Sequence, residues 1–411
     1  TIILYLNNYI IDLSFKHYVL DDFFDVKDFP ELEKEIEKLA KIWYKPIEKE
    51  TMYFNIQLGE VIEFEFRKLW SFLLKIDTVL NTIKKLNPSR IFIITEKEED
   101  IRIIKEIIKY NKLKIKLNYK KFEVQQKKNS KKLYSIVAKV QNYYFNLNSF
   151  RLKNKNKILF IGNLRQNKSV LKELKKNNKN IIIRAGEYLG KGFFNEHTYF
   201  YLTFKDIKNN TNKIKSEFIG RWMRVKENKR FRENLFYKTP LFDIIEDKLE
   251  YYFADYFIKL INYIETIKKL KDKIDVVVVN NDVLPFERSI VKVTHKLRIP
   301  TLAMIDGYLP EKQIKKGTSR YFPFHTDKII LFSNHQKKIA VKDKNSENSL
   351  IVTGYPPFDE YFKSKKISKE EICRKLNILN NKSIILYTTE GHSKNLTESA
   401  ILGAITEKNY Q

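Results

Sequence analysis

Three carboxylates and one glycine-containing loop are the residues of this sequence best suited to chemistry. Asp282, Asp306 and Glu187 each closely follow an apolar run, and a carboxylate at such a strand end can accept a proton from a hydroxyl group as a general base. The loop 388–393 follows another apolar run and precedes a helical pattern, so its backbone amides could bind a phosphate group. Its candidates are Thr388, Thr389, Gly391, His392 and Ser393. The alternatives are a turn residue at Asp282 and an ordinary N-capped loop at 388–393.

Glycine, asparagine and tyrosine residues occupy the same position after other apolar runs. They are Gly162, Asn163, Asn280, Asn281, Gly354 and Tyr355. Because ligands of open parallel sheets bind where the strands end, in the loops that open the following helices, the series predicts one long cleft.

The stretch 349–362, SLIVTGYPPFDEYF, combines an apolar run with a glycine, two prolines and an acid. This pattern predicts a buried strand followed by a rigid turn. We expect Gly354 to allow close backbone approach, the prolines to prevent a helix until after Asp359, and Asp359 to cap the next segment.

Short apolar runs alternate with helical patterns along most of the chain, which is typical of strand–helix–strand units in a parallel sheet. A helical block is predicted at about 212–270. We expect one mainly parallel sheet to contain the apolar runs 90–95, 157–161, 181–183, 275–279 and 301–305. The predicted fold class is therefore α/β.

The order of motifs between about 275 and 395 resembles a known family. A strand ending in Asn-Asn-Asp is followed by IPTLAMIDGYLPE, DKIILFS, VTGYPPFDEY and IILYTTEG. This order is similar to surface-polysaccharide glycosyltransferases of the two-Rossmann (GT-B) type, of the capsule and lipopolysaccharide kind, and to related CDP-glycerol-type polyol-phosphate transferases. Gly354, Pro356 and Asp359 fit the family's Gly-x-Pro-x-x-Asp pattern.

The resemblance implies an enzyme that moves a sugar from a nucleotide-activated donor to a cell-surface or lipid-linked glycan. It places Gly354, Tyr355 and the loop 388–393 at the donor, and the residues after strands 157–161 and 275–279 at the acceptor. No cofactor is implied beyond the nucleotide sugar as co-substrate. The sequence shows no metal-ligand spacing, which favours a metal-independent reaction. A CDP-activated polyol-phosphate transferase is the alternative enzyme.

Two Rossmann-like domains are expected from the resemblance. The first covers 1–345 and includes the helical block, and the second begins within 346–411 and is incomplete. Relatives continue with segments that are not found before Gln411, so we expect a truncated chain. Many relatives also carry Gln-His-Gly where this chain has Ile305-Asp306-Gly307, so a histidine role does not transfer to this position.

The chain is strongly basic, with 78 Lys and Arg residues against 50 Asp and Glu residues and a net charge of +28. Such an excess indicates an anionic partner: nucleic acid, an anionic membrane surface or a phosphorylated substrate. Nucleic-acid binding is the alternative of another class, but no phosphate-loop, zinc or RNA-binding signature supports it. We expect a cytoplasmic enzyme, peripheral at the inner face of the cell membrane, with basic segments 111–132 and 151–180 facing the lipid.

Overall fold

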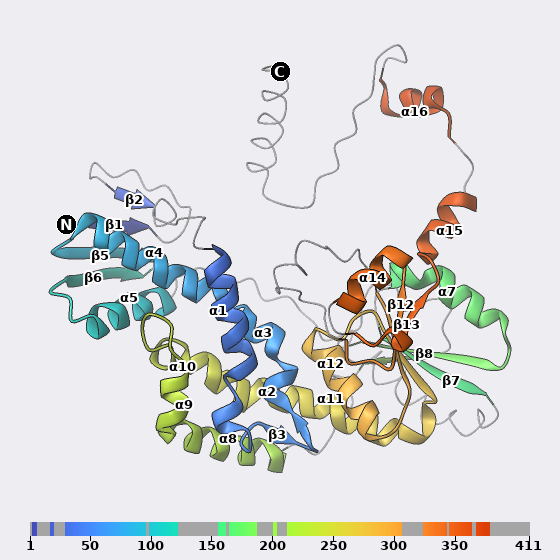
Figure 1. Cartoon of the computed structure of the whole chain (residues 1–411), viewed down its shortest axis with the longest axis horizontal. Helices are drawn as coiled ribbons and strands as arrows, with labels where there is room; N and C mark the ends of the chain where they lie inside the picture. Colours follow the sequence, from blue (N-terminus) through green and yellow to red (C-terminus); the bar gives the residue numbers. More distant parts are fainter. Residues whose placement is uncertain are drawn as a thin grey trace. The chain divides into compact units, whose positions relative to one another are not determined.

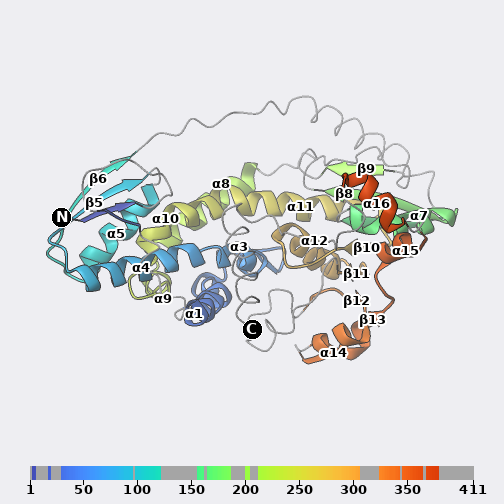
Figure 2. The ribbon, with the colours of Figure 1, turned by 90° about the horizontal axis from the view of Figure 1, so that it is seen from above.

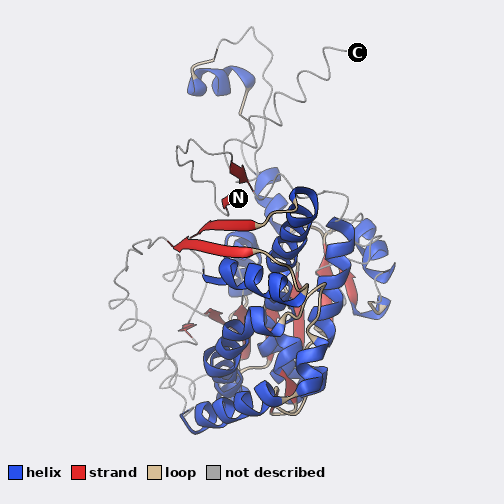
Figure 3. Cartoon of the chain, turned by 90° about the vertical axis from the view of Figure 1, so that its left-hand side faces the viewer, coloured by secondary structure: helices blue, strands red, loops and turns tan. Residues whose placement is uncertain are grey.

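A computed structural model gives the fold, and its described residues are 2–5, 17–19, 29–95, 98–121, 155–161, 164–186, 200–203, 212–305, 324–342, 345–363 and 367–378. The chain divides into two compact units, Thr1–Asp359 and Glu360–Gln411. The first unit is a mixed α/β structure in which strands lie among helices, as the colouring by secondary structure shows (Figure 3). The predicted fold class is confirmed at this level.

A small parallel sheet has the strand order β2-β1-β5-β6. Its strands are β1 (Ile2–Tyr5), β2 (His17–Val19), β5 (Arg90–Thr95) and β6 (Lys116–Lys121). Ile2 pairs with Ile91, and Arg90 pairs with Lys116. The expectation that 90–95 shares a sheet with the later strands is therefore wrong. An apolar strand can pair with any parallel neighbour, and here β5 pairs with β1 at the start of the chain.

The large sheet has seven parallel strands in the order β13-β12-β11-β10-β7-β8-β9. Its strands are β7 (Asn156–Ile161), β8 (Asn180–Gly186), β9 (Phe200–Thr203), β10 (Val276–Val279), β11 (Thr301–Met304), β12 (Lys328–Leu331) and β13 (Leu350–Val352). The chain adds β7 to β9 in one direction and β10 to β13 in the other, so the order reverses between β7 and β10. Such a reversal of strand order is compatible with the switch point of a doubly wound Rossmann-like sheet.

Helices cover the large sheet unequally. Alternate residues such as Leu159, Val277 and Ala303 belong to the main core. Their neighbours Ile158 and Val278 form a smaller cluster on the other face, together with α7 (Leu164–Lys176), which lies alongside β7 and β8 (Figure 1). The two periodic faces follow from the alternation of side chains along a strand.

Helices α8 (Asn212–Glu227), α9 (Lys229–Asn234), α10 (Phe242–Tyr251) and α11 (Phe257–Leu270) confirm the predicted helical block. A π-helical turn, Tyr252–Tyr256, joins the last two helices. Trp222 packs on Phe253 with ring centroids 5.5 Å apart, and α10 lies beside α5 (Glu98–Tyr110), where Arg102 pairs with Asp247 (Figure 2). These aromatic contacts make the block part of the first unit's core.

The remaining described elements are mainly helical. They are α1 (Phe29–Ile42), a 3₁₀ turn (Lys45–Ile47), β3 (Met52–Tyr53), β4 (Ile56–Gln57), α2 (Leu58–Val61), α3 (Glu63–Arg67), α4 (Trp70–Leu86), a 3₁₀ turn (Lys271–Lys273), α12 (Pro285–Lys296), α14 (Asn334–Lys342), a 3₁₀ turn (Glu347–Ser349), α15 (Pro356–Lys363) and α16 (Lys369–Leu376).

The passage out of the large sheet differs from its prediction in four ways. Strand β13 is the edge strand of this sheet and two of its three residues are exposed, whereas a buried strand was expected. Helix α15 begins at Pro356, because the first turn of a helix needs no backbone N–H donors. Asp359 consequently lies inside that first turn instead of capping it. Gly354 has φ +92 with open space where a Cβ would lie, so its backbone angle, not close approach, requires glycine.

Candidate functional site

The carboxyl ends of the large sheet's strands form the edge at which a ligand of a doubly wound sheet would bind. Asn280 follows β10 and donates from Nδ2 to the carbonyl oxygen of Met304, at 3.4 Å, which ties two strand ends together. Asn281 accepts the N–H groups of Val283 and Leu284 at 3.3 and 3.2 Å. Both predicted acceptor-side asparagines therefore shape the turn between β10 and α12.

Asp282 is fully buried at this turn. Its Oδ2 accepts the backbone N–H groups of His325 and Thr326, the latter at 3.1 Å. Its Oδ1 has no hydrogen-bond partner among the described residues. Burial raises the pKa of Asp282 to about 6, and its hydrogen bonds to the backbone of 325 and 326 and the charge of Arg288 limit the rise. A buried carboxylate that holds a neighbouring segment favours a positioning role over direct proton transfer.

A cluster of charged residues surrounds Asp282, and sequence reasoning missed it. Arg288 on α12 donates from Nε to the Asp282 carbonyl at 3.0 Å and from Nη1 to Glu63 Oε2 at 3.3 Å. Lys292, one turn further along α12, contacts Glu60 at 2.7 Å. The cluster thus joins α12, the helix between β10 and β11, to α2 and α3. The spacing of Arg288 from Lys292 and of Glu60 from Glu63 is helical, but the sequence gives no indication that the two pairs meet.

The ring of His325 completes the cluster. Its Nε2 lies 3.9 Å from Glu60 Oε1, and its side chain is 26% exposed. Burial lowers the pKa of His325 to about 4, and the positive charges of Lys292 and Arg288 act in the same direction. The pKa of Glu63 is lowered because Arg67 and Arg288 outweigh its burial. His325 is therefore neutral at physiological pH while the cluster around it is charged.

The two donor-side residues of the Gly354 turn lie beside an apolar cavity of about 460 Å³. The ring of Tyr355 packs between Phe332 and Phe358, with centroid distances of 4.2 and 5.0 Å. Tyr355 is thus fixed by aromatic packing next to the end of β12.

Many predicted site residues lie outside the described residues. They are Asp306, Glu187, Gly162, Asn163, Thr388, Thr389, Gly391, His392 and Ser393. Parts of the two predicted basic segments, 122–132 and 151–154, and most of the loop before β12 lie outside them as well. The structure brings together Asn280, Asn281 and Asp282 at one turn, and it places Gly354 and Tyr355 at the end of a strand two positions away from β11.

Two properties of the described part of the chain bear on metal ions and membranes. No group of three or more metal-ligating side chains occurs in it. None of its helices is both long and apolar enough to cross a bilayer.

Comparison with known proteins gives no assignment. No family model matches the chain, and no curated protein matches it.

Proposed function

We propose that this protein is a glycosyltransferase that moves a sugar from a nucleotide-activated donor to a glycan or lipid-linked acceptor. The proposal joins the ordered motifs of 275–395, which resemble GT-B surface-polysaccharide transferases, with the Rossmann-like order of the large sheet. In this proposal, residues up to Asp359 form the acceptor side, and the segment that begins at Glu360 opens the donor side.

The observation that supports the proposal most directly is the reversal of strand order between β7 and β10. Ligands bind outside the carboxyl ends of the strands at such a switch point. In the sequence, Gly162-Asn163 follow β7 and Asn280-Asn281-Asp282 follow β10. Both sets were predicted as site residues from the sequence.

The proposed roles separate positioning from chemistry. Asp282 is buried and bound to the backbone at 325 and 326, so we assign it to holding the edge of the cleft in shape. Asp306 comes two residues after the end of β11 and directly after the buried Ile305. We assign it the role of general base. Glu187, after β8, is the next residue to test for that role.

The experiment measures donor affinity by calorimetry and transfer rate on the full gene product, with UDP-, GDP- and dTDP-sugars and CDP-glycerol as donors. Asp306→Asn should retain donor affinity and lose about 100-fold in transfer rate, as expected for a general base. Gly391→Leu should weaken donor binding by crowding the loop 388–393. The control Asp272→Asn, at an exposed position, should change neither quantity.

Two results would contradict the proposal. Absence of binding to every nucleotide donor would reject the transferase, and transfer from CDP-glycerol alone would replace it with the polyol-phosphate enzyme. Transfer at the parent rate by Asp306→Asn would move the base to Glu187 without rejecting the activity.

A further inference from the structure

Two cavities on the large sheet share walls. One has a volume of about 460 Å³ and reaches Gly354, and the other has a volume of about 650 Å³ and reaches Arg298. Val276 and Leu302 line both of them. Because the two cavities adjoin at these residues, we call them together the sheet groove. It runs from the amino ends of β11 and β12 along one face of the sheet to the turn after β13, and each part has the size of a ligand pocket.

The floor of the sheet groove is an apolar sheet face. Ile158, Phe160, Val278 and Met304 are alternate strand residues of the smaller hydrophobic cluster, whereas their strand neighbours belong to the main core. Parallel sheets are normally covered on both faces. Within the described residues, α7 is the only helix that contributes to this cluster, and the groove lies beyond it. The floor therefore offers an apolar surface to a ligand.

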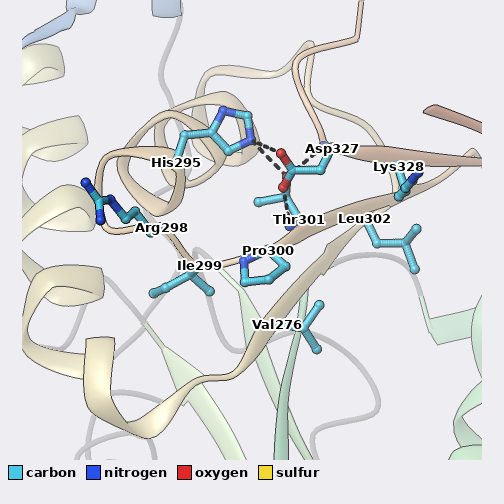
Figure 4. Close-up of a pocket in the computed structure, with 9 residues that line it drawn as sticks. All are labelled: Val276, His295, Arg298, Ile299, Pro300, Thr301, Leu302, Asp327 and Lys328. Atoms are coloured by element: carbon cyan, nitrogen blue, oxygen red, sulfur yellow. Dashed lines mark hydrogen bonds and ion pairs between the residues drawn. The ribbon is translucent and has the colours of Figure 1, made fainter. Parts of the chain in front are cut away.

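Basic side chains gather at one end of the sheet groove only. Arg298 and Lys328 lie on either side of the Thr301–Asp327 pair in the close-up, and His295 points toward Asp327 (Figure 4). Arg298 is exposed, and Lys328 donates to the carbonyl oxygen of Asn348 at 2.8 Å. At the opposite end, the described polar lining residues are Thr353, Tyr355 and Asp359. The two ends of the groove therefore differ in charge, and only the end at Arg298 and Lys328 is basic.

Asp327, the acidic residue at the basic end of the groove, already has partners in the structure. Asp327 Oδ2 accepts the N–H and the hydroxyl of Thr301, each at 2.7 Å. Its Oδ1 lies 3.5 Å from His295 Nε2. The carboxylate of Asp327 is therefore held against β11 and α12, and it forms no ion pair with Arg298 or Lys328.

We propose that the sheet groove binds an amphipathic anion, with a long apolar chain on the sheet face and a negatively charged head at Arg298 and Lys328. Charge complementarity selects the head group, and the apolar floor selects the chain. The charged head would lie at the amino edge of the sheet, away from the carboxyl edge proposed for sugar transfer, and only the far end of the groove reaches the turn at Gly354 and Tyr355. The inference does not require that activity.

The test measures binding of dodecyl phosphate, below the concentration at which it forms micelles, by calorimetry on the full chain. Dodecanol and inorganic phosphate are the matched probes for the chain and the head. We expect dodecyl phosphate to bind more tightly than dodecanol, and inorganic phosphate to bind weakly. Dodecanoate then distinguishes a general anionic head from one that must be a phosphate.

Variants test the two ends separately. Arg298 has φ +59, which asparagine tolerates well, so Arg298→Asn removes the charge without new backbone strain. Together with Lys328→Gln, it should weaken dodecyl phosphate binding about tenfold and leave dodecanol binding unchanged, since two exposed charges together supply about that factor. The control Lys296→Gln removes an exposed charge outside the lining and should have no effect. Leu302→Gln should weaken both chain-containing probes, with circular dichroism to check folding.

If another part of the chain or a second copy occupies the groove, the binding measurements will give a different result. If another part of the chain covers the groove, dodecyl phosphate will not bind to the full chain, and the proposal is rejected. If a second copy covers it, the protein will be dimeric in light scattering and the probe will again fail to bind. Equal loss of binding with Lys296→Gln would show nonspecific charge attraction and would also reject the site. Probe binding without any nucleotide-sugar binding would retain the groove and reject only the proposed transferase.

Discussion

The carboxylate of Asp282 accepts the backbone N–H of His325, a residue 43 positions further along the chain. This bond joins the turn after β10 to the segment before β12. It also places a buried acid with a raised pKa beside a histidine with a lowered pKa, so the two residues resist ionisation for the same reason, which is burial.

The pH dependence of stability follows from these two shifts, which have opposite consequences. Folding raises the pKa of Asp282 from 3.8 to about 6, so the folded state binds more protons and stability falls as pH rises between those values. Folding lowers the pKa of His325 from 6.5 to about 4, so the unfolded state binds more protons and stability rises with pH between those values. We expect the two slopes largely to cancel near pH 5 in the parent.

Single variants should uncover each slope in urea denaturation at pH 4 to 7. Asp282→Asn should make stability rise with pH, and His325→Asn should make it fall, each by at most about 1.4 kcal/mol per pH unit. The double variant should lack both slopes, and the lowered pKa of Glu63 should leave a rise with pH only below about pH 5. Parallel profiles for the parent and both single variants would show that neither group titrates differently on folding.

Gly354 should tolerate alanine poorly because of its backbone angle. Its φ of +92 is unfavourable for an L-residue, although no atom would contact the added Cβ within 4 Å. We expect Gly354→Ala to cost about 1 to 2 kcal/mol in chemical denaturation. Gly220 is the matched control, since it also has open space around it but lies within α8. Gly220→Ala should stabilise by about 0.5 to 1 kcal/mol, and a similar effect at both positions would reject the argument.

Local patterns made much of the fold predictable. Strand β5 has the predicted limits, 90–95, because its apolar run and flanking residues depend only on nearby sequence. The helical block was predictable for the same reason, and α8 to α11 lie within 212–270. Sheet membership was not predictable for β5, because pairing with Ile2 or with a later strand depends on distant chain segments. The helix at Pro356 was predictable in principle, since proline is favoured at the first helical position.

The candidate site shows the same division between local and distant effects. Asn281 was selected as a residue at the end of a strand, and its bonds to the N–H groups of Val283 and Leu284 are local. The role of Asp282 depends on His325 and Arg288, and nothing in the spacing of these residues places them together. A sequence identifies polar residues at strand ends, but it does not reveal which of them the fold will bury.

The buried ion pair between Arg288 and Glu63 should contribute to the link between α12 and α3. Their side chains are 9% and 14% exposed at a separation of 3.3 Å. Removing one partner leaves a buried charge, so Arg288→Met and Glu63→Gln should each destabilise the protein by about 3 kcal/mol. The double variant should cost less than the sum of the two.

An exposed pair serves as the control for this double-mutant cycle. Lys229 and Glu233 lie 3.8 Å apart with side chains 89% and 65% exposed. Their coupling energy should be under about 0.5 kcal/mol, because water screens such pairs. Equal coupling in both cycles would mean that burial does not strengthen the Arg288–Glu63 pair.

The lysines of the segment 127–132 should contribute to binding of an anionic membrane. They are Lys127, Lys128, Lys131 and Lys132. Each basic residue near an anionic bilayer adds on the order of 1 kcal/mol to binding. Changing the four lysines to glutamate should therefore weaken flotation with anionic vesicles at about 0.15 M salt and leave flotation with neutral vesicles unchanged.

A second set of four lysines separates local from total charge in this experiment. Lys229, Lys269, Lys271 and Lys296 are exposed, and changing them to glutamate alters the net charge by the same amount. If segment 127–132 forms part of a membrane-binding face, the second set should reduce flotation less, because surface attraction falls off within about 8 Å at this ionic strength. Equal reductions would show that binding follows net charge alone, and unchanged flotation in the first set would exclude the segment from membrane binding.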